Sequence, residues 1–358
     1  MKVGLIIYGD LNTRSGGYLY DRRLIEHLRA AGDTVELIQL PWRSWLQHLT
    51  DNISPSLWRR ILQMDLDILL QDELNHPSLV LPNTLERLQQ QRQWPILSIV
   101  HHLRCCEPEH PWWARNLYEA VERAYLATVD GFIFNSHVTR SEVEARTPPR
   151  PHVVAWPGGD RLGALAPDDI RPRALRPGPL QLLFIGNITP RKGLHTLLDA
   201  LSTLPYDLWR LHVVGSTAVA PEYMRRIRSQ IAPMRDSITV YGSLPDTDLK
   251  RLLRQSHALA VPSSYEGFGI VYMEAAAFGL PAIASTAGAA REIVQTGRSG
   301  HLIAPGDSAA LAYHLEGWVH DRMMLARMGE SARMRFADHP TWAQSTAQIR
   351  AFMMEQLE

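Results

Sequence analysis

Residues 261–286 read VPSSYEGFGIVYMEAAAFGLPAIAST, and this stretch decides the fold. An apolar run that ends at residue 263 is followed by a loop with two glycines, Gly267 and Gly269. A segment of small apolar residues follows, and then a second apolar run, 281–285. Two buried runs joined by a helical crossover are typical of parallel strands in an α/β sheet. The stretch therefore predicts a strand, a loop, a helix and a parallel strand.

The same alternation of apolar runs and helical segments extends in both directions from this stretch. Short Val/Ile/Leu-rich runs alternate with longer amphipathic segments, as expected of strands buried between helices. The first half predicts strands over 3–8, 35–40, 67–71, 95–100, 131–135 and 152–156. The second half predicts strands over 180–186, 209–215, 238–242, 257–263 and 281–285.

Two such series predict an α/β protein with two Rossmann-like, doubly wound domains. The stretch from Pro157 to Pro179 is rich in proline and glycine without a hydrophobic period, so it is interpreted as the linker. The predicted domains are residues 1–170 and 180–335, and a helix over 341–358 is expected to pack back on the first domain. Ligands of doubly wound sheets bind beyond the carboxyl ends of the strands, so we expect the site in a deep cleft between the domains.

Composition excludes several classes of partner. Lys plus Arg and Asp plus Glu both number 37 of 358 residues, so no overall positive field attracts nucleic acid. The N-terminal apolar run is too short for a signal peptide, and no run approaches a membrane-spanning length. Cys105 and Cys106 are adjacent, which suits neither a metal pair nor a disulfide framework. The sequence therefore predicts a cytoplasmic protein without a transmembrane segment and without a nucleic-acid partner.

The loop of the opening stretch has the chemistry of a phosphate site. The backbone amides of Phe268, Gly269 and Ile270 are expected near the start of a helix, where unpaired donors and the helix dipole favour anions. Glu266 precedes this turn, and Glu274 follows it by a little over two helical turns. One carboxylate is therefore expected at the loop tip and the other on the helix.

A second loop, in FIGNITPRKGLHTLLDALSTL (184–204), places cations at the end of a strand. Arg191 and Lys192 lie between the predicted strand end at Gly186 and a helix that begins near Gly193. Cations at this position can neutralise a pyrophosphate, above all as charge develops on a leaving nucleotide.

The first half offers a glycine pair and a histidine pair at strand ends. Gly16 and Gly17 are expected to open the first helix with their amides toward a ligand. Their spacing is not that of a dinucleotide-binding fingerprint, which argues against a dehydrogenase. His101 and His102 follow the strand over 95–100, where a histidine can donate to a sugar hydroxyl or a phosphate.

With these motifs, the chain resembles the retaining glycosyltransferases of the GT-B fold, family 4, or group 1. The resemblance rests on the spacing of Glu266 and Glu274 around an E-G-F-G core, and it extends to Pro281 and Gly288. It implies that Glu266 contacts the donor sugar and Glu274 the nucleotide ribose.

The resemblance also assigns the remaining site residues. It implies Lys192 at the donor phosphates, a glycine pair at Gly16 and Gly17, and a functional histidine. Alignment of the preceding strand favours His101 for this histidine, with His102 as the open alternative. The family has an arginine where this chain has Asn187, so either Arg191 replaces it or Asn187 donates to the phosphate as a neutral group. We therefore expect His101, Lys192 and Glu266 as catalytic residues. The donor is expected to bind Gly16, Gly17, Asn187, Arg191, Lys192, Glu266, Phe268, Gly269, Ile270 and Glu274.

The predicted function is transfer of a sugar from a nucleotide-sugar donor, with UDP, GDP or another base, to an acceptor hydroxyl with retention of configuration. No metal and no cofactor are expected. A nucleotide-sugar epimerase of the same fold and a catalytically silent sugar-nucleotide binder are the alternatives. Trp/Arg-rich segments at 41–60 and 110–126 favour an amphipathic or lipid-linked acceptor, met at the inner membrane face, although core packing explains them equally well. The sequence leaves the oligomeric state open.

Overall fold

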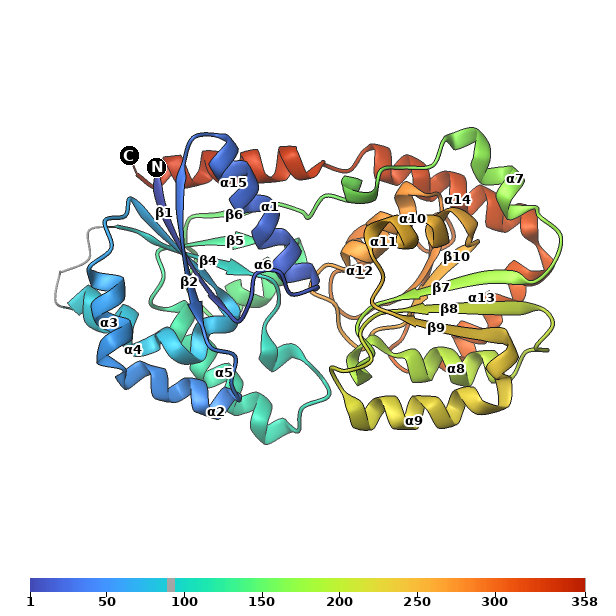
Figure 1. Cartoon of the computed structure of the whole chain (residues 1–358), viewed down its shortest axis with the longest axis horizontal. Helices are drawn as coiled ribbons and strands as arrows, with labels where there is room; N and C mark the ends of the chain where they lie inside the picture. Colours follow the sequence, from blue (N-terminus) through green and yellow to red (C-terminus); the bar gives the residue numbers. More distant parts are fainter. Residues whose placement is uncertain (89–93, 358) are drawn as a thin grey trace. The chain divides into compact units, whose positions relative to one another are not determined.

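The computed structural model describes residues 1–88 and 94–357, and these divide into two compact units. The first unit comprises residues 1–157 and 342–358, and the second comprises residues 158–341. Each unit is an α/β domain with one parallel sheet (Figure 1).

The first unit contains a sheet in the order β2-β1-β3-β4-β5-β6, in which every neighbouring pair is parallel. Its strands are β1 (Lys2–Tyr8), β2 (Thr34–Leu40), β3 (Ile68–Asp72), β4 (Ile96–Val100), β5 (Gly131–Phe134) and β6 (His152–Val154). Its α-helices are α1 (Gly16–Ala30), α2 (Trp45–His48), α3 (Pro55–Leu62), α4 (His76–Leu88), α5 (Trp112–Leu126), α6 (His137–Glu144) and α15 (Trp342–Glu355). Figure 1 shows α1 and α15 on one face of this sheet and α2 to α5 on the other. Because helices cover both faces of this sheet, its strands are nearly continuous apolar runs.

The second unit contains a sheet in the order β12-β11-β10-β7-β8-β9, again with parallel pairs. Its strands are β7 (Leu180–Ile185), β8 (Trp209–Val214), β9 (Ile238–Gly242), β10 (Ala258–Val261), β11 (Ala282–Ser285) and β12 (Gly300–Ile303). Its α-helices are α7 (Ile170–Ala174), α8 (Leu194–Ser202), α9 (Pro221–Ile231), α10 (Asp246–Gln255), α11 (Ile270–Ala277), α12 (Ala290–Ile293), α13 (Ser308–His320) and α14 (Arg322–Ala337). In Figure 1, α10, α11 and α14 lie on one face and α8 and α9 on the other.

The strand orders locate the binding edge of each sheet. In the first unit the chain winds outward from β1 to β2 and then returns to β3, so the order reverses between β1 and β3. In the second unit it reverses between β7 and β10. A crevice opens at such a reversal, beyond the carboxyl ends of the two strands. Ligand-binding residues are therefore expected in the loops that follow β1, β3, β7 and β10.

Residues 158–179, predicted as a linker, lie within the second unit. Arg173 of α7 is buried and donates hydrogen bonds to the backbone carbonyl oxygens of Phe278 (2.6 Å) and Gly279 (2.7 Å). The first unit accordingly ends at residue 157, before the predicted limit of residue 170. Proline and glycine in this segment prevent long helices, but they do not prevent packing.

The C-terminal helix α15 packs on the first unit. The ring of Trp342 meets that of Tyr20 edge to face, and Arg350 forms an ion pair with Asp33 at 2.7 Å. Ser345 donates a hydrogen bond to the carbonyl oxygen of Trp156 (2.5 Å). The chain thus returns to its first unit after completing its second.

Candidate functional site

Two loops meet where the strand order of the second sheet reverses. The loop after β7 carries Arg191 and Lys192, and the loop after β10 carries Glu266. The amide of Ser264 donates to the carbonyl oxygen of Arg191 at 2.8 Å, which ties the loops together. Gly193 has a left-handed φ of 71°, and an added Cβ would lie 2.1 Å from the carbonyl oxygen of Pro262. Only glycine allows this approach of the two backbones.

The approach creates an ion pair between Lys192, which is partly buried, and Glu266, which is buried. The ammonium group of Lys192 contacts Oε1 of Glu266, and the hydroxyl of Ser263 donates to the same oxygen at 2.7 Å. Arg191 adds a second cation, with Nη1 3.9 Å from Oε2 of Glu266. Gly186 leaves room for the aliphatic stem of Lys192, since a Cβ there would lie 3.2 Å from its Cδ. The predicted catalytic residues Lys192 and Glu266 are therefore brought together with Arg191.

This environment keeps Glu266 ionised. Burial raises the pKa of Glu266, but Lys192 and Arg191 outweigh burial, so the net pKa lies below its ordinary value. Burial and the neighbouring Arg191 lower the pKa of Lys192, whereas Glu266 raises it. A carboxylate stabilised in this way is a weak base, and it is better suited to accept hydrogen bonds from hydroxyl groups.

The predicted phosphate cradle is the first turn of α11. Gly269 is the N-cap residue, with φ 92°, and Ile270 is the first helical residue. A Cβ on Gly269 would lie 2.5 Å from the ring of Tyr272. The side chain of Phe268 is buried, so its backbone amide is the part of it suited to contact a ligand. The first-turn amides of a helix lack intrahelical partners, which makes this turn a favourable place for an anion.

Glu274 lies on α11 and is paired with a residue that the sequence did not indicate. Nε of Arg161 donates to Oε1 of Glu274 at 2.8 Å, and Nη2 lies 2.7 Å from the same oxygen. The third nitrogen of this guanidinium donates to Asp246 at 2.5 Å. Arg161 and Glu274 are 113 positions apart, so no local motif could have revealed their contact. Glu274 itself is 2% exposed.

Asn187 and Arg191, the two candidates for the missing arginine, point to different partners. The side-chain oxygen of Asn187 accepts a hydrogen bond of 3.4 Å from the amide of Ser216. Arg191 donates to the carbonyl oxygen of Tyr265 (2.9 Å), beside Glu266. The geometry therefore places the cation of Arg191 next to the Glu266 loop and the side-chain oxygen of Asn187 at the end of β8.

In the first unit, the glycine pair and His101 lie together. Ser15 caps α1 by accepting from the amide of Tyr18, so Gly16 and Gly17 begin the helix as predicted. A Cβ on Gly17 would lie 3.2 Å from Cδ2 of His101. The glycine thus allows the helix start to pack on the imidazole ring, a reason that differs from the expected contact with phosphate.

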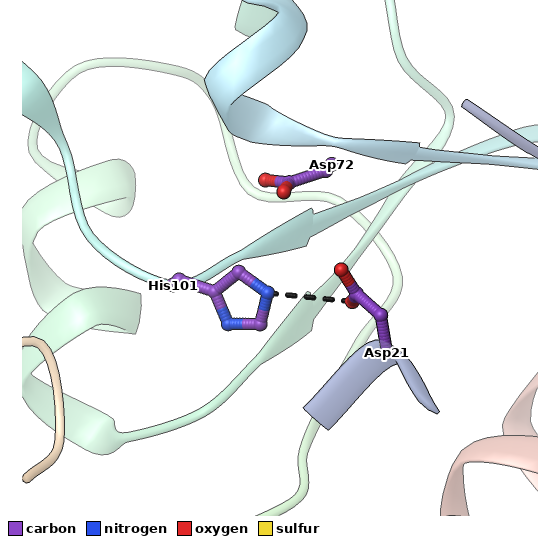
Figure 2. A group of neighbouring side chains, drawn as sticks. All are labelled: Asp21, Asp72 and His101. Carbon is purple, nitrogen blue, oxygen red and sulfur yellow. Dashed lines mark ion pairs between the residues drawn. The ribbon is translucent and has the colours of Figure 1, made fainter. Parts of the chain in front are cut away.

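His101 faces two buried aspartates that the sequence did not indicate (Figure 2). Its Nε2 lies 3.4 Å from Oδ1 of Asp21 on α1, an ion-pair distance without hydrogen-bond geometry. Asp72 ends β3 beside them. Burial lowers the pKa of His101, but Asp21, Asp72 and Glu73 outweigh it and raise the net pKa above its ordinary value. These carboxylates therefore favour the imidazolium form.

His102 has a different environment. Its Nε2 lies 3.1 Å from Oε1 of Glu107, at a partly exposed position. Of the two histidines, His101 is the one packed against Gly17.

In the described ranges, two clusters of buried residues each have three potential metal-ligand atoms within 4.8 Å of one another. They are Asp21, Asp72 and His101, and Glu73, His76 and Glu122. That the reaction uses no metal and no cofactor stays a prediction. Within residues 1–88 and 94–357, no helix has the length and apolar character to cross a membrane.

Residues 167–335 match the family model described as glycosyl transferases group 1. Among curated proteins, the chain is 34% identical over 184 residues to the glycogen synthase of Mycobacterium tuberculosis, covering 49% of this chain and 44% of that protein. The chain thus spans less than half the length of this relative.

Solved structures resemble the whole chain. Sucrose-phosphate synthase from Thermosynechococcus elongatus has a TM-score of 0.82 at 22% identity, covering 99% of this chain and 98% of that one. Anabaena Alr3699/HepE in complex with UDP-glucose has a TM-score of 0.78 at 19% identity, covering 99% and 100%. At these identities the likeness establishes the fold, which is GT-B, with its two doubly wound domains. The match over residues 167–335 identifies this part of the chain, most of the second unit, as a member of the glycosyl transferases group 1 family.

Proposed function

We propose that this protein transfers a sugar from a nucleotide-sugar donor to an acceptor hydroxyl with retention of anomeric configuration. The observation that carries the proposal is the contact of Lys192 with the buried Glu266 where the strand order of the second sheet reverses. The contact lies in the family-matched part of the chain, and the first turn of α11 follows Glu266 directly.

In this proposal, each group of the second unit has one task. Lys192 and Arg191 neutralise the diphosphate as the bond to the sugar breaks, when its negative charge grows. The amides of Phe268, Gly269 and Ile270 bind a phosphate at the start of α11. Glu266 accepts hydrogen bonds from sugar hydroxyls, and Glu274 accepts them from the ribose.

In this proposal, retention follows from attack of the acceptor on the face from which the diphosphate leaves, with the diphosphate and not Glu266 as the base. Because Lys192, Arg191 and Ser263 stabilise its carboxylate, Glu266 is poorly suited to deprotonate an acceptor. The leaving diphosphate then takes the proton of the acceptor hydroxyl on the face from which it departs. The new bond forms on the same face of the sugar. His101, as an imidazolium, is proposed to polarise a donor oxygen.

UDP-sugars are proposed as the first donors to examine, because a protein of the same fold is described in complex with UDP-glucose. The test is a nucleotide-release assay with UDP-, GDP-, ADP- and TDP-sugars against lipid-linked, oligosaccharide and small acceptors. We expect acceptor-dependent release of one nucleotide and, by proton NMR of the product, the anomeric configuration of the donor. A product of inverted anomeric configuration contradicts the mechanism. An epimerised sugar formed without an acceptor supports a nucleotide-sugar epimerase, and binding of the nucleotide sugar without turnover supports a catalytically silent binder.

The acceptor is proposed to be amphipathic, and a cytoplasmic enzyme would meet such an acceptor at the inner membrane face. In the first unit Trp112 and Trp113, at the start of α5, are 74% and 60% exposed, and Trp42 is 64% exposed. Trp45 is buried and donates to Nε2 of His76 (3.2 Å), so it belongs to the core.

Replacing Trp112 and Trp113 together with serine is expected to raise the KM for an amphipathic acceptor about 10-fold, because two exposed apolar contacts are lost. The KM for the donor should stay unchanged. Steady-state kinetics with both substrates varied measure the two constants separately. An unchanged acceptor KM contradicts the role of these tryptophans.

A further inference from the structure

The segment that precedes α7 is fixed along α11. A Cβ on Gly159 would lie 2.4 Å from Cγ of Met273, so the backbone at residue 159 lies directly on the helix. At the other end of the segment, the amide of Leu165 donates to the carbonyl oxygen of Ala277 at 3.0 Å. Arg161 lies between these two anchor points. The backbone therefore holds the base of the Arg161 side chain at a fixed place beside Glu274.

The side chain of Arg161 spans two carboxylates in different settings. It makes two short contacts to Oε1 of Glu274, which is buried, and one to Asp246, whose side chain is 62% exposed. An isolated carboxylate that is buried as deeply as Glu274 would be expected to protonate. The pairing with a guanidinium, which stays charged at all physiological pH values, opposes that protonation.

We propose that Arg161 is a positioning residue of the donor site, which keeps the carboxylate of Glu274 ionised and oriented so that it can accept hydrogen bonds from the nucleotide ribose. This inference rests on the proposed function, in which Glu274 binds the ribose. Because Arg161 engages Oε1, it leaves Oε2 as the acceptor available to a diol. A protonated Glu274 would instead present a hydroxyl, and it would lose the charge that strengthens a hydrogen bond from the ribose.

The charges around Glu274 fix the direction of the pH effect. Burial raises the pKa of Glu274, Arg161 lowers it, and Asp246 raises it, with a net pKa above the ordinary value. Removal of Arg161 takes away the group that lowers this pKa, so the carboxyl group protonates at a higher pH. A variant without Arg161 should therefore bind the donor poorly near neutral pH and recover as the pH rises. The wild-type protein should vary much less over the same range.

The experiment measures affinity by calorimetry for wild-type protein, Arg161→Met and Arg161→Lys. The probe is whichever of UDP-glucose, GDP-mannose, ADP-glucose and TDP-glucose gives the largest thermal shift. We expect Arg161→Met to bind about 10-fold more weakly near pH ~7, in keeping with loss of a charge-assisted hydrogen bond. Within this variant, affinity should rise toward pH ~8.5, and Arg161→Lys should restore most of it near pH ~7.

Two further variants separate positioning from a structural role. Asp246→Asn removes the negative charge of the other partner of Arg161, a charge that raises the pKa of Glu274, so this variant should bind without the pH dependence of Arg161→Met. The double variant Arg161→Met/Glu274→Gln should bind no more weakly than Glu274→Gln alone, because Arg161 acts through that carboxylate. Circular dichroism checks that each variant is folded.

Affinity of Arg161→Met that equals wild type, or that is reduced equally at every pH, overturns the positioning role while the proposed function stands. A further loss of affinity in the double variant, relative to Glu274→Gln, also overturns it. Failure of the wild-type protein to bind any of the four nucleotide sugars contradicts the proposed function itself, and the inference with it.

Discussion

Lys192→Ala is expected to lower kcat/KM by about 100- to 1000-fold, the usual effect of removing one group that stabilises developing charge. The ammonium group of Lys192 contacts Glu266 at the reversal point of the second sheet, and the growing charge of the diphosphate is proposed to form there. Arg191 stays 3.9 Å from the other oxygen of Glu266 in this variant, so one of the two proposed cations remains. The kinetics are measured with the donor and acceptor that the release assay identifies.

The variant also leaves Glu266 buried beside fewer cations, which is expected to destabilise the fold by about 3 kcal/mol. Lys192→Met/Glu266→Gln is the matched control, because it replaces the ion pair with two neutral side chains of similar size. The control should regain most of the thermal stability and none of the activity. If folded Lys192→Ala keeps more than about a tenth of the wild-type kcat/KM, Lys192 has no part in stabilising the leaving group.

Gly288→Ala is expected to have the second large effect, although residue 288 contributes no side chain to the site. Gly288 has φ 77° and pairs with Glu266 in an isolated β-bridge. An added Cβ would lie 2.0 Å from the carbonyl oxygen of Glu266, where no carbon atom fits. The backbone of Glu266 must therefore move. A displacement of about 1 Å in a catalytic group lowers activity by about 100-fold.

Gly306→Ala is the control for Gly288→Ala, because Gly306 has the same φ of 77° and its Cβ would meet nothing within 4 Å. It should lose about 1 kcal/mol from backbone strain alone and keep its activity. Thermal melts and donor kinetics of the two variants separate strain from displacement of Glu266. Equal activity of the two variants would mean that the position of Glu266 does not limit the reaction.

Most of the fold could be predicted because buried parallel strands have a plain sequence pattern. Runs such as 3–8 and 180–186 are almost wholly apolar, and they form β1 and β7 within two residues of the predicted limits. β12 was missed because GHLI is short and contains glycine and histidine. It forms because its backbone pairs with β11 at the edge of the sheet, a contact that has no local signal.

Parts of the candidate site could be predicted only where they are local in sequence. Lys192 and Glu266 were placed by the motifs around them, and the structure brings them into contact. Arg161 and Asp21 were missed because their partners, Glu274 and His101, are distant in sequence. The fold brings such pairs together, without any local pattern in the sequence. Whether Arg191 or Asn187 replaces the family's arginine stays a prediction, because their contacts are to Tyr265 and Ser216 and not to a phosphate.

The measurement that tests the donor site most directly is a thermal-shift comparison of wild-type protein and Glu274→Gln with UDP, GDP, ADP and TDP sugars. A ligand that binds only the folded state raises the melting temperature by mass action. At a ligand concentration 100 times its Kd, the free energy of unfolding increases by about 2.7 kcal/mol. The proposed site predicts a shift with one nucleotide in the wild-type protein and a much smaller shift in the variant. An equal shift in both proteins, or none with any nucleotide, would contradict it.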